Sequence, residues 1–269
     1  MNRLSDFKKM HEQNEPLFLP NAWDVLSALV LAQVGFKAIG TTSWGIANSM
    51  GANDGEQIQF DEHLALIEKI ISAVEIPVTV DIESGYSDSI SVVVDNVLKI
   101  ADLGASGINI EDSLKNRPQK NRSGLNDKNR QCELLAQIRG ALDSHGCRDF
   151  FINARIDTYL QQKEPLQETI ARAIRYIDSG ADGVFVPGLC DKSEITELVK
   201  SIAAPLNVMS LPGCTDIESL GELGVKRFSI GSALSDATIS FIEESARTIF
   251  AEHNTEILHA NSAVKRVFK

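Results

Sequence analysis

Short apolar runs alternate with amphipathic stretches along almost the whole chain. An apolar run bounded by glycine, proline or polar residues predicts a strand, whereas apolar positions recurring every three to four residues predict a helix. On this basis the chain has eight strand-helix units in about 250 of its 269 residues. The predicted strands are 16–20, 35–43, 76–85, 105–112, 149–157, 182–188, 205–210 and 225–232. The predicted helices are 25–34, 63–74, 91–104, 131–142, 169–180, 192–202, 216–223 and a final helix of about twenty residues.

Four helix-to-strand joints share one pattern, a glycine followed by two residues and an apolar run, as in VGFKAIG and LGASGINI. This is the chemistry of a short loop with a left-handed glycine cap. Eight such units fit a (β/α)8 TIM barrel better than a doubly wound sheet, which often carries a glycine-rich phosphate loop. No GxGxxG or GxxxxGK[ST] motif is present, and no linker divides the chain, so residues 1–269 are predicted to form one domain.

Composition narrows the classes of partner. The net charge of -11 disfavours nucleic acid and anionic membranes, and no stretch has the length of a membrane span. The N-terminal residues lack the apolar core of a signal peptide, which predicts a cytoplasmic protein. The four cysteines are scattered without a CxxC pair, so neither a zinc site nor a disulfide framework is indicated.

Carboxylates gather where two neighbouring predicted strands end. Asp81 and Glu83 follow one apolar run and would share a face if the strand persists through Ile82, while Glu111 and Asp112 end the next strand. Buried like charges need a cation, a shared proton or water. Because the four acids offer only oxygen and no histidine lies among them, we expect Mg²⁺, or alternatively Mn²⁺.

Other polar side chains end the remaining strands. Arg155 lies in an apolar strand, where it serves either as a structural ion pair with Glu83 or Asp157 or as a clamp on a substrate carboxylate. The loop of Thr42, Ser43 and Trp44 offers backbone amides, and Asn207 is a further polar candidate for substrate binding. A metal beside such a clamp suits a 2-oxo acid, whose enolate the metal would stabilise.

Residues 113–130 form a polar segment directly after the Glu111-Asp112 pair. A surface insertion is one interpretation, and a mobile active-site lid that excludes water is the other, which its position favours. Lys120, Asn121 and Arg122 are its candidate reactive or anion-binding residues.

An ordered series of motifs then resembles the isocitrate lyase/phosphoenolpyruvate mutase superfamily. It runs through LPNAWDVLSALVLAQVGFKAIGTTS, MGANDG, VDIESGY, GINIED, INARID, FVPG, PLNVMSLPG and GVKRFSIGSAL. The resemblance implies a (β/α)8 barrel whose C-terminal helix, within residues of about 232–269, is swapped between subunits of a homodimer or homotetramer. It also implies a Mg²⁺-bound small carboxylate and cleavage or formation of a C–C or P–C bond.

The same resemblance assigns roles to individual residues. Asp81 would bind Mg²⁺ directly, and Glu83 and Glu111 would act through water. Thr42, Ser43 and Trp44 would hold the substrate carboxylate, although Trp44 is bulkier than the family's residue there. Asp54 would lie near the metal and the reacting group, and Arg155 would bind substrate.

The lid sequence selects among branches of the superfamily. It contains no cysteine, unlike the KKCGH-type lids of isocitrate and methylisocitrate lyases, and Lys120-Asn121 only loosely resembles the lysine-threonine-asparagine run of phosphoenolpyruvate mutases. The sequence therefore predicts a Mg²⁺-dependent lyase that cleaves a C–C bond in a small 2-oxo or 2-hydroxy di- or tricarboxylate through a metal-stabilised enolate. Phosphoenolpyruvate mutase or phosphonopyruvate hydrolase chemistry is the alternative, and a barrel that only binds a carboxylate is a third.

Overall fold

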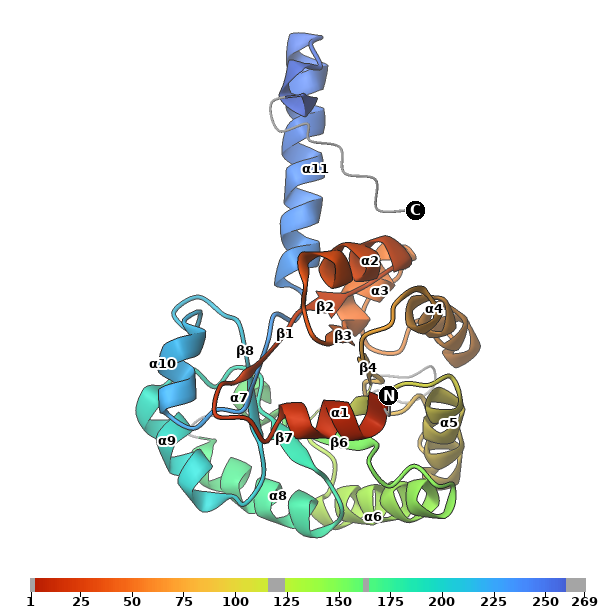
Figure 1. The fold of residues 1–269 in the computed structure, drawn as a ribbon, viewed down its shortest axis with the longest axis vertical. Coiled ribbons are helices and arrows are strands. Elements are labelled where there is room, and N and C mark those ends of the chain that lie inside the picture. The colour runs from red at the N-terminus through yellow and green to blue at the C-terminus, as the bar shows by residue number, and fades with distance from the viewer. Residues whose placement is uncertain (1–2, 116–123, 162–164, 260–269) are drawn as a thin grey trace.

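In the computed structural model, described for residues 3–115, 124–161 and 165–259, parallel strands form a nearly closed barrel surrounded by helices (Figure 1). The strand order is β1-β9-β8-β7-β6-β5-β4-β3-β2, and every pairing is parallel. This confirms the predicted TIM barrel. The strands are β1 Leu17–Leu19, β2 Asn21–Ala22, β3 Ile39–Thr41, β4 Val78–Asp81, β5 Gly107–Glu111, β6 Phe151–Arg155, β7 Gly183–Phe185, β8 Leu206–Met209 and β9 Arg227–Ser229.

The first barrel strand is divided in two by Pro20. β1 pairs with β9 and β2 pairs with β3, so this single stretch of chain closes the barrel on both sides. Proline has no N–H to give to a ladder, but its carbonyl still accepts a hydrogen bond from the Gly40 amide at 2.9 Å. The nine strands of the described chain therefore match the eight predicted strands, except that the first continues past its predicted end at Pro20 into β2.

The helices largely follow the predicted segments. α2 spans Val25–Val34 as predicted, because Asp24, with Ser27, forms its capping box and Gly35 ends it at a φ of 108°. α6 begins at Lys128, three residues before the predicted start, so the last residues of the predicted 113–130 lid form its first turn. The others are α1 Arg3–Met10, α3 Ser43–Ser49, α4 Phe60–Ala73, α5 Ile90–Asp102, α7 Thr158–Gln161, α8 Leu166–Asp178, α9 Lys192–Ser201, α10 Ile217–Glu222, α11 Ala233–Glu252 and the short 3-10 helix Glu256–Leu258.

The core has two parts. Most buried aliphatic side chains lie between the strands and the surrounding helices. A smaller cluster joins Phe7 of α1 to Leu17 and Leu19 of β1, Ala38 just before β3 and Phe151 at the start of β6. α1 therefore covers the amino-terminal end of the barrel, and in the described residues the carboxyl end of the strands remains open for a site.

α11 departs from the ring of helices and extends away from the barrel (Figure 1). Large apolar side chains along it are exposed, including Phe241 at 61%, Ile242 at 60% and Phe250 at 82%. Among the described residues, no helix covers the barrel wall between α10 and α2 (Figure 1). Two grooves of about 520 and 710 Å³ meet there at Pro16 and Phe18. None of the helices in the described ranges is long and apolar enough to span a bilayer.

Candidate active site at the carboxyl end of the barrel

A cavity of about 160 Å³ opens at the carboxyl ends of the strands. Its lining combines polar residues from strand ends with an apolar wall: Asn21, Thr41, Thr42, Ser43, Trp44, Asp54, Asp81, Asn109, Arg155, Leu160, Phe185, Pro187, Met209, Ser229, Gly231 and Ser232. The structure thus brings six of the predicted site residues to one cavity, namely Thr42, Ser43, Trp44, Asp54, Asp81 and Arg155. Its size suits a small molecule with a few polar groups.

The segment after β3 is a helix, which corrects the prediction of a loop there. Thr42 is the N-cap of α3, and its hydroxyl accepts a hydrogen bond from the Gly45 amide at 3.4 Å. Ser43 and Trp44 form the first turn, where backbone amides have no hydrogen-bond partner within the helix itself. The Ser43 amide lies 3.4 Å from Asp81 Oδ2, and the Trp44 indole donates to Asp236 of α11 at 3.0 Å.

The acidic loop after β4 is held by residues that follow α3. Glu56 Oε1 accepts hydrogen bonds from the Ser84 amide, the Ser84 hydroxyl and the Tyr86 amide. In return, the Glu56 amide donates to Glu83 Oε1 at 2.8 Å. The prediction that the strand persists through Ile82 was wrong, since β4 ends at Asp81 and Glu83 has a φ of 51°. A left-handed turn braced by Glu56 places Glu83 instead.

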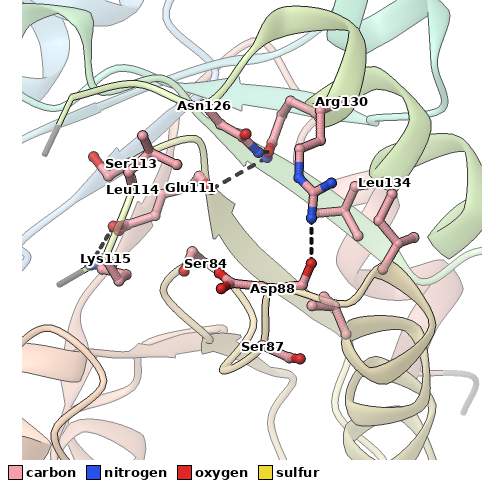
Figure 2. A pocket seen from close by; sticks show the side chains of 13 residues that line it. Ser84, Ser87, Asp88, Glu111, Ser113, Leu114, Lys115, Asn126, Arg130 and Leu134 are labelled. Atoms are coloured by element: carbon pink, nitrogen blue, oxygen red, sulfur yellow. Dashed lines mark hydrogen bonds and ion pairs between the residues drawn. The ribbon is translucent and has the colours of Figure 1, made fainter. Parts of the chain in front are cut away.

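Glu83 and Glu111 face each other across the ammonium group of Lys115. Lys115 Nζ lies 2.8 Å from Glu83 Oε2 and 2.5 Å from Glu111 Oε1, and Figure 2 shows its side chain reaching Glu111 from the segment after β5. Burial raises the pKa of Glu83 to about 7 and that of Glu111 to about 8, despite the nearby cations. Burial lowers the pKa of Lys115, but the carboxylates of Glu111 and Glu83 outweigh this effect and raise it.

The carboxylates do not converge on one point within the described part of the chain, where no group of three or more His, Cys, Asp or Glu side chains is arranged to hold a metal ion. Asp81 lines the main cavity, whereas Glu111 lines a second cavity of about 40 Å³ beside Lys115 and Arg130 (Figure 2). Their chemistry nevertheless fits a hard cation, because all three donors are carboxylates and two of them are buried beside a single ammonium group.

Arg155 is paired with two carboxylates and also reaches the main cavity. Its Nη1 lies 2.9 Å from Glu111 Oε2, and its Nε lies 2.6 Å from Asp157 Oδ1. Its guanidinium carbon is 5.9 Å from the centre of the Phe185 ring. Of the predicted structural partners, Asp157 is confirmed, and Glu111 takes the place of Glu83. Because 20% of the side chain is exposed at the cavity, a role in substrate binding is compatible with these pairs.

Asp112 points away from Glu111 and has a structural role, which removes it from the four expected acids. Its Oδ2 accepts hydrogen bonds from Arg172 at 2.9 Å and from the Tyr176 hydroxyl at 2.8 Å. Its Oδ1 accepts from the Asp157 amide at 3.0 Å. Consecutive strand residues project to opposite faces, so Glu111 faces the barrel interior and Asp112 faces α8.

Replacing Asp112 with alanine is expected to destabilise the fold by about 3–5 kcal/mol, because Arg172 and the Tyr176 hydroxyl would lose their buried carboxylate partner and Arg172 would keep only the partly exposed Glu168. Urea denaturation measures this loss. Glu111→Gln serves as the comparison, since it changes the neighbouring acid without removing a partner of Arg172. Equal stability of the wild type and Asp112→Ala would contradict the structural role.

Three further predicted site residues, Asp54, Asn207 and Lys120, differ in where they lie relative to the cavity. Asp54 lines the cavity, and its buried Oδ1 has no hydrogen-bond partner among the described residues. Asn207 is buried in the barrel below the cavity lining, where its Oδ1 accepts from the Ser229 hydroxyl at 3.3 Å. Lys120, with Asn121 and Arg122, lies outside the described residues.

The sequence reasoning missed Lys115 and the apolar wall of the cavity. Lys115 stands four residues after Glu111 in an irregular segment, and no motif marks it. The wall comes from Leu160, Phe185, Pro187 and Met209. The FVPG run could have indicated part of it, since Phe185 and Pro187 stand where a strand ends.

Comparison with known proteins agrees with this arrangement. The family model described as phosphoenolpyruvate phosphomutase matches residues 7–250. The chain belongs to this family. It is thereby a member of the phosphoenolpyruvate mutase/isocitrate lyase superfamily, which confirms the resemblance seen in the sequence.

Two relatives illustrate the range of the family. The chain is 41% identical over 244 residues to the uncharacterized protein Rv1998c of Mycobacterium tuberculosis H37Rv, covering 90% of this chain and 88% of that one. It is 26% identical to an oxaloacetate decarboxylase of Pseudomonas savastanoi pv. phaseolicola over 264 residues, covering 94% and 89% of the two chains. Enzymes are therefore established among its relatives.

Two solved structures share the fold. One is a protein of Burkholderia cenocepacia J2315 that is described provisionally as a phosphonomutase. The two structures have a TM-score of 0.86 and 34% sequence identity, over 92% of this chain and 100% of that one. The other is a phosphonopyruvate hydrolase in complex with oxalate and Mg²⁺, at a TM-score of 0.84 and 22% identity over 99% and 93% of the chains. The second likeness shows a common fold.

Proposed function

We propose that this protein is a Mg²⁺-dependent lyase that cleaves a C–C bond in a small 2-oxo or 2-hydroxy di- or tricarboxylate. The observation that carries the proposal is the cavity of about 160 Å³ in which Arg155 and the first turn of α3 face the carboxylate of Asp81. Arg155 and the amides at the start of α3 supply donors for carboxylate oxygens, and Asp81 supplies an oxygen ligand for a cation. The cytoplasmic location expected from the sequence belongs to the same proposal.

In this proposal Asp81, Glu83 and Glu111 hold Mg²⁺, with Mn²⁺ as the alternative. The ion supplies Lewis-acid stabilisation of negative charge that develops on the substrate. Arg155 orients the substrate carboxylate, and the N-terminus of α3 binds its oxygens. Leu160, Phe185 and Met209 exclude water from the opposite side. Asp54 holds a carboxylate oxygen free of described partners at the cavity, where it can accept or return a proton.

The second candidate is phosphoenolpyruvate mutase or phosphonopyruvate hydrolase chemistry. The match to the phosphoenolpyruvate phosphomutase family model favours it. Against it, residues 113–130 only loosely resemble the lid sequence of the phosphoenolpyruvate mutases, so we favour a carbon acid as substrate.

An assay of product release separates the two candidates. Pyruvate and glyoxylate are measured after incubation with oxaloacetate, isocitrate, 2-methylisocitrate, alkylmalates or phosphonopyruvate, with Mg²⁺ or with EDTA. Metal-dependent release from a carbon acid would support the lyase. If phosphonopyruvate alone reacts, with loss of its ³¹P phosphonate signal, the lyase proposal is overturned in favour of P–C chemistry. If none of these compounds reacts, a barrel that only binds a carboxylate is favoured.

Replacing Arg155 with lysine is expected to raise KM about 10- to 100-fold, with a smaller effect on kcat, because lysine keeps the charge but loses the planar two-point contact with a carboxylate. Steady-state kinetics on the substrate found above measure this change. Lys128→Arg, at an ion pair 3.0 Å from Glu168 outside the cavity, is the control. An unchanged KM would leave Arg155 as a structural residue only.

The proposal includes a homodimer or homotetramer in which α11 lies on a neighbouring subunit. The exposed apolar side chains of α11 and the uncovered wall between α10 and α2 support it. Soluble proteins rarely leave such a face exposed unless a partner covers it.

A further inference from the structure

Lys115 occupies the place between two of the proposed metal-binding carboxylates. Its Nζ lies 2.8 Å from Glu83 Oε2 and 2.5 Å from Glu111 Oε1, and 13% of its side chain is exposed. The remaining oxygens of both acids have other partners. Glu83 Oε1 accepts from the Glu56 amide at 2.8 Å, and Glu111 Oε2 pairs with Arg155 at 2.9 Å.

A divalent ion held through Glu83 and Glu111 would draw on the same two oxygens that Lys115 uses. An ammonium group and a divalent cation repel each other, and both cannot share these oxygens at contact distance without a large electrostatic cost. The third acid, Asp81, lines the main cavity and does not line the second cavity beside Lys115.

The structure also contains a cavity into which the ammonium group of Lys115 can move. The cavity of about 40 Å³ beside Lys115 is lined by Ser84, Ser87 and Asp88, and also by Arg130 and by apolar side chains (Figure 2). A lysine side chain has four rotatable carbon units and one compact charge, so it can move its head group by several ångströms while the backbone stays in place.

We propose that Lys115 is an internal competitor for the divalent cation and sets the affinity of the metal site. Without the metal it pairs with both Glu83 and Glu111, and it withdraws from them when the metal binds. The inference rests on the proposed metal dependence. It assigns to Lys115 a positioning role at the site and no contact with substrate.

The first test compares Mg²⁺ binding to the wild type and to Lys115→Met by isothermal titration calorimetry near pH 8. Methionine keeps the length of the side chain without the charge. We expect the Kd for Mg²⁺ to fall about tenfold or more, since the competing cation is gone. Lys128→Met, which removes a lysine from an ion pair with Glu168 outside the site, should leave the Kd unchanged.

Thermal unfolding of the same proteins provides a readout that does not depend on activity. Without Mg²⁺, Lys115→Met should unfold at a lower temperature than the wild type, because two buried carboxylates lose their shared cation. Saturating Mg²⁺ should raise the Tm of Lys115→Met more than that of the wild type, as linkage requires for tighter binding.

A measurement on the wild type alone covers the case in which the variant fails to fold. A short pulse of acetic anhydride followed by peptide mass spectrometry measures the reactivity of each lysine. Mg²⁺ should increase acetylation of Lys115 severalfold and leave that of Lys128 unchanged. Unchanged Lys115 labelling in a protein that binds Mg²⁺, or an equal Kd in Lys115→Met, would overturn the inference and leave the metal site standing. Absence of Mg²⁺ binding in wild type and variant alike would instead overturn the proposed metal dependence.

Discussion

Replacing Asp81 with alanine is expected to abolish metal-dependent turnover while leaving the barrel folded. The side chain ends β4 at the main cavity, and its carboxylate accepts only two long hydrogen bonds in the described structure, from the Ser43 amide at 3.4 Å and the Glu83 amide at 3.3 Å. Losing them costs little stability. Losing a direct metal ligand removes several kcal/mol of charge stabilisation, so kcat/KM should fall on the order of a thousandfold.

The experiment pairs kinetics with a binding and a folding measurement. Asp81→Ala should lose Mg²⁺ binding in calorimetry and keep the far-UV circular dichroism of the wild type. Asp216→Ala is the matched control, because this aspartate also lies on a loop after a barrel strand but only caps α10. Full activity in Asp81→Ala would contradict the metal assignment, and loss of the folded signal would make Asp81 a structural residue.

The fold was predictable because hydrophobic spacing and turn residues agree along the chain. α2 lies where the apolar pattern predicted it, and Gly35 adopts the left-handed conformation that the joint required. The parallel barrel then follows from the repetition of such units. The one interruption, at Pro20, occurs at a residue that cannot donate to a strand ladder.

The site was only partly predictable, because residue spacing does not fix where irregular backbone turns. Asp81 could be placed, since it ends a regular strand. Glu83 could not, because its position depends on a left-handed turn and on Glu56, 27 residues earlier in the chain. Ser43 was expected in a loop, yet Thr42 caps a helix that begins at Ser43. The Thr42 hydroxyl did not identify this helix in the sequence, because glycines in the same segment favoured a loop.

Glu111 and Asp112, two adjacent acids at the end of one strand, also could not be told apart from the sequence. The sequence offers two adjacent acids, and only the partners in space separate them: Arg155 and Lys115 for Glu111, and Arg172 for Asp112. Arg172 lies 60 residues from Asp112, on α8. A pair of acids in a sequence therefore identifies the end of a strand as chemically important without saying which acid faces the site.

Placing two aspartates on α11, at Phe241 and Ile242, is expected to dissociate the assembly into monomers. These side chains are 61% and 60% exposed in the single chain, and burying each against a neighbouring subunit contributes about 1.5–3 kcal/mol. The uncovered wall between α10 and α2, with Phe18 at its centre, is the apolar surface that a second copy of α11 would cover. Two carboxylates in that contact would have to be desolvated without a partner.

Sedimentation equilibrium measures the mass of the wild type and of the Phe241→Asp, Ile242→Asp double variant over a range of concentrations. We expect a dimer or tetramer for the wild type and a monomer with a lower Tm for the variant. Arg247→Asp on the same helix is the control, because Arg247 is an exposed residue paired within the helix to Glu243 and should leave the mass unchanged. A monomeric wild type would contradict the assembly.

Trp44 links the cavity to α11, because it lines the cavity and donates a hydrogen bond to Asp236 near the start of that helix. A shift of α11 in the dissociated variant would therefore also change the position of Trp44 in the cavity.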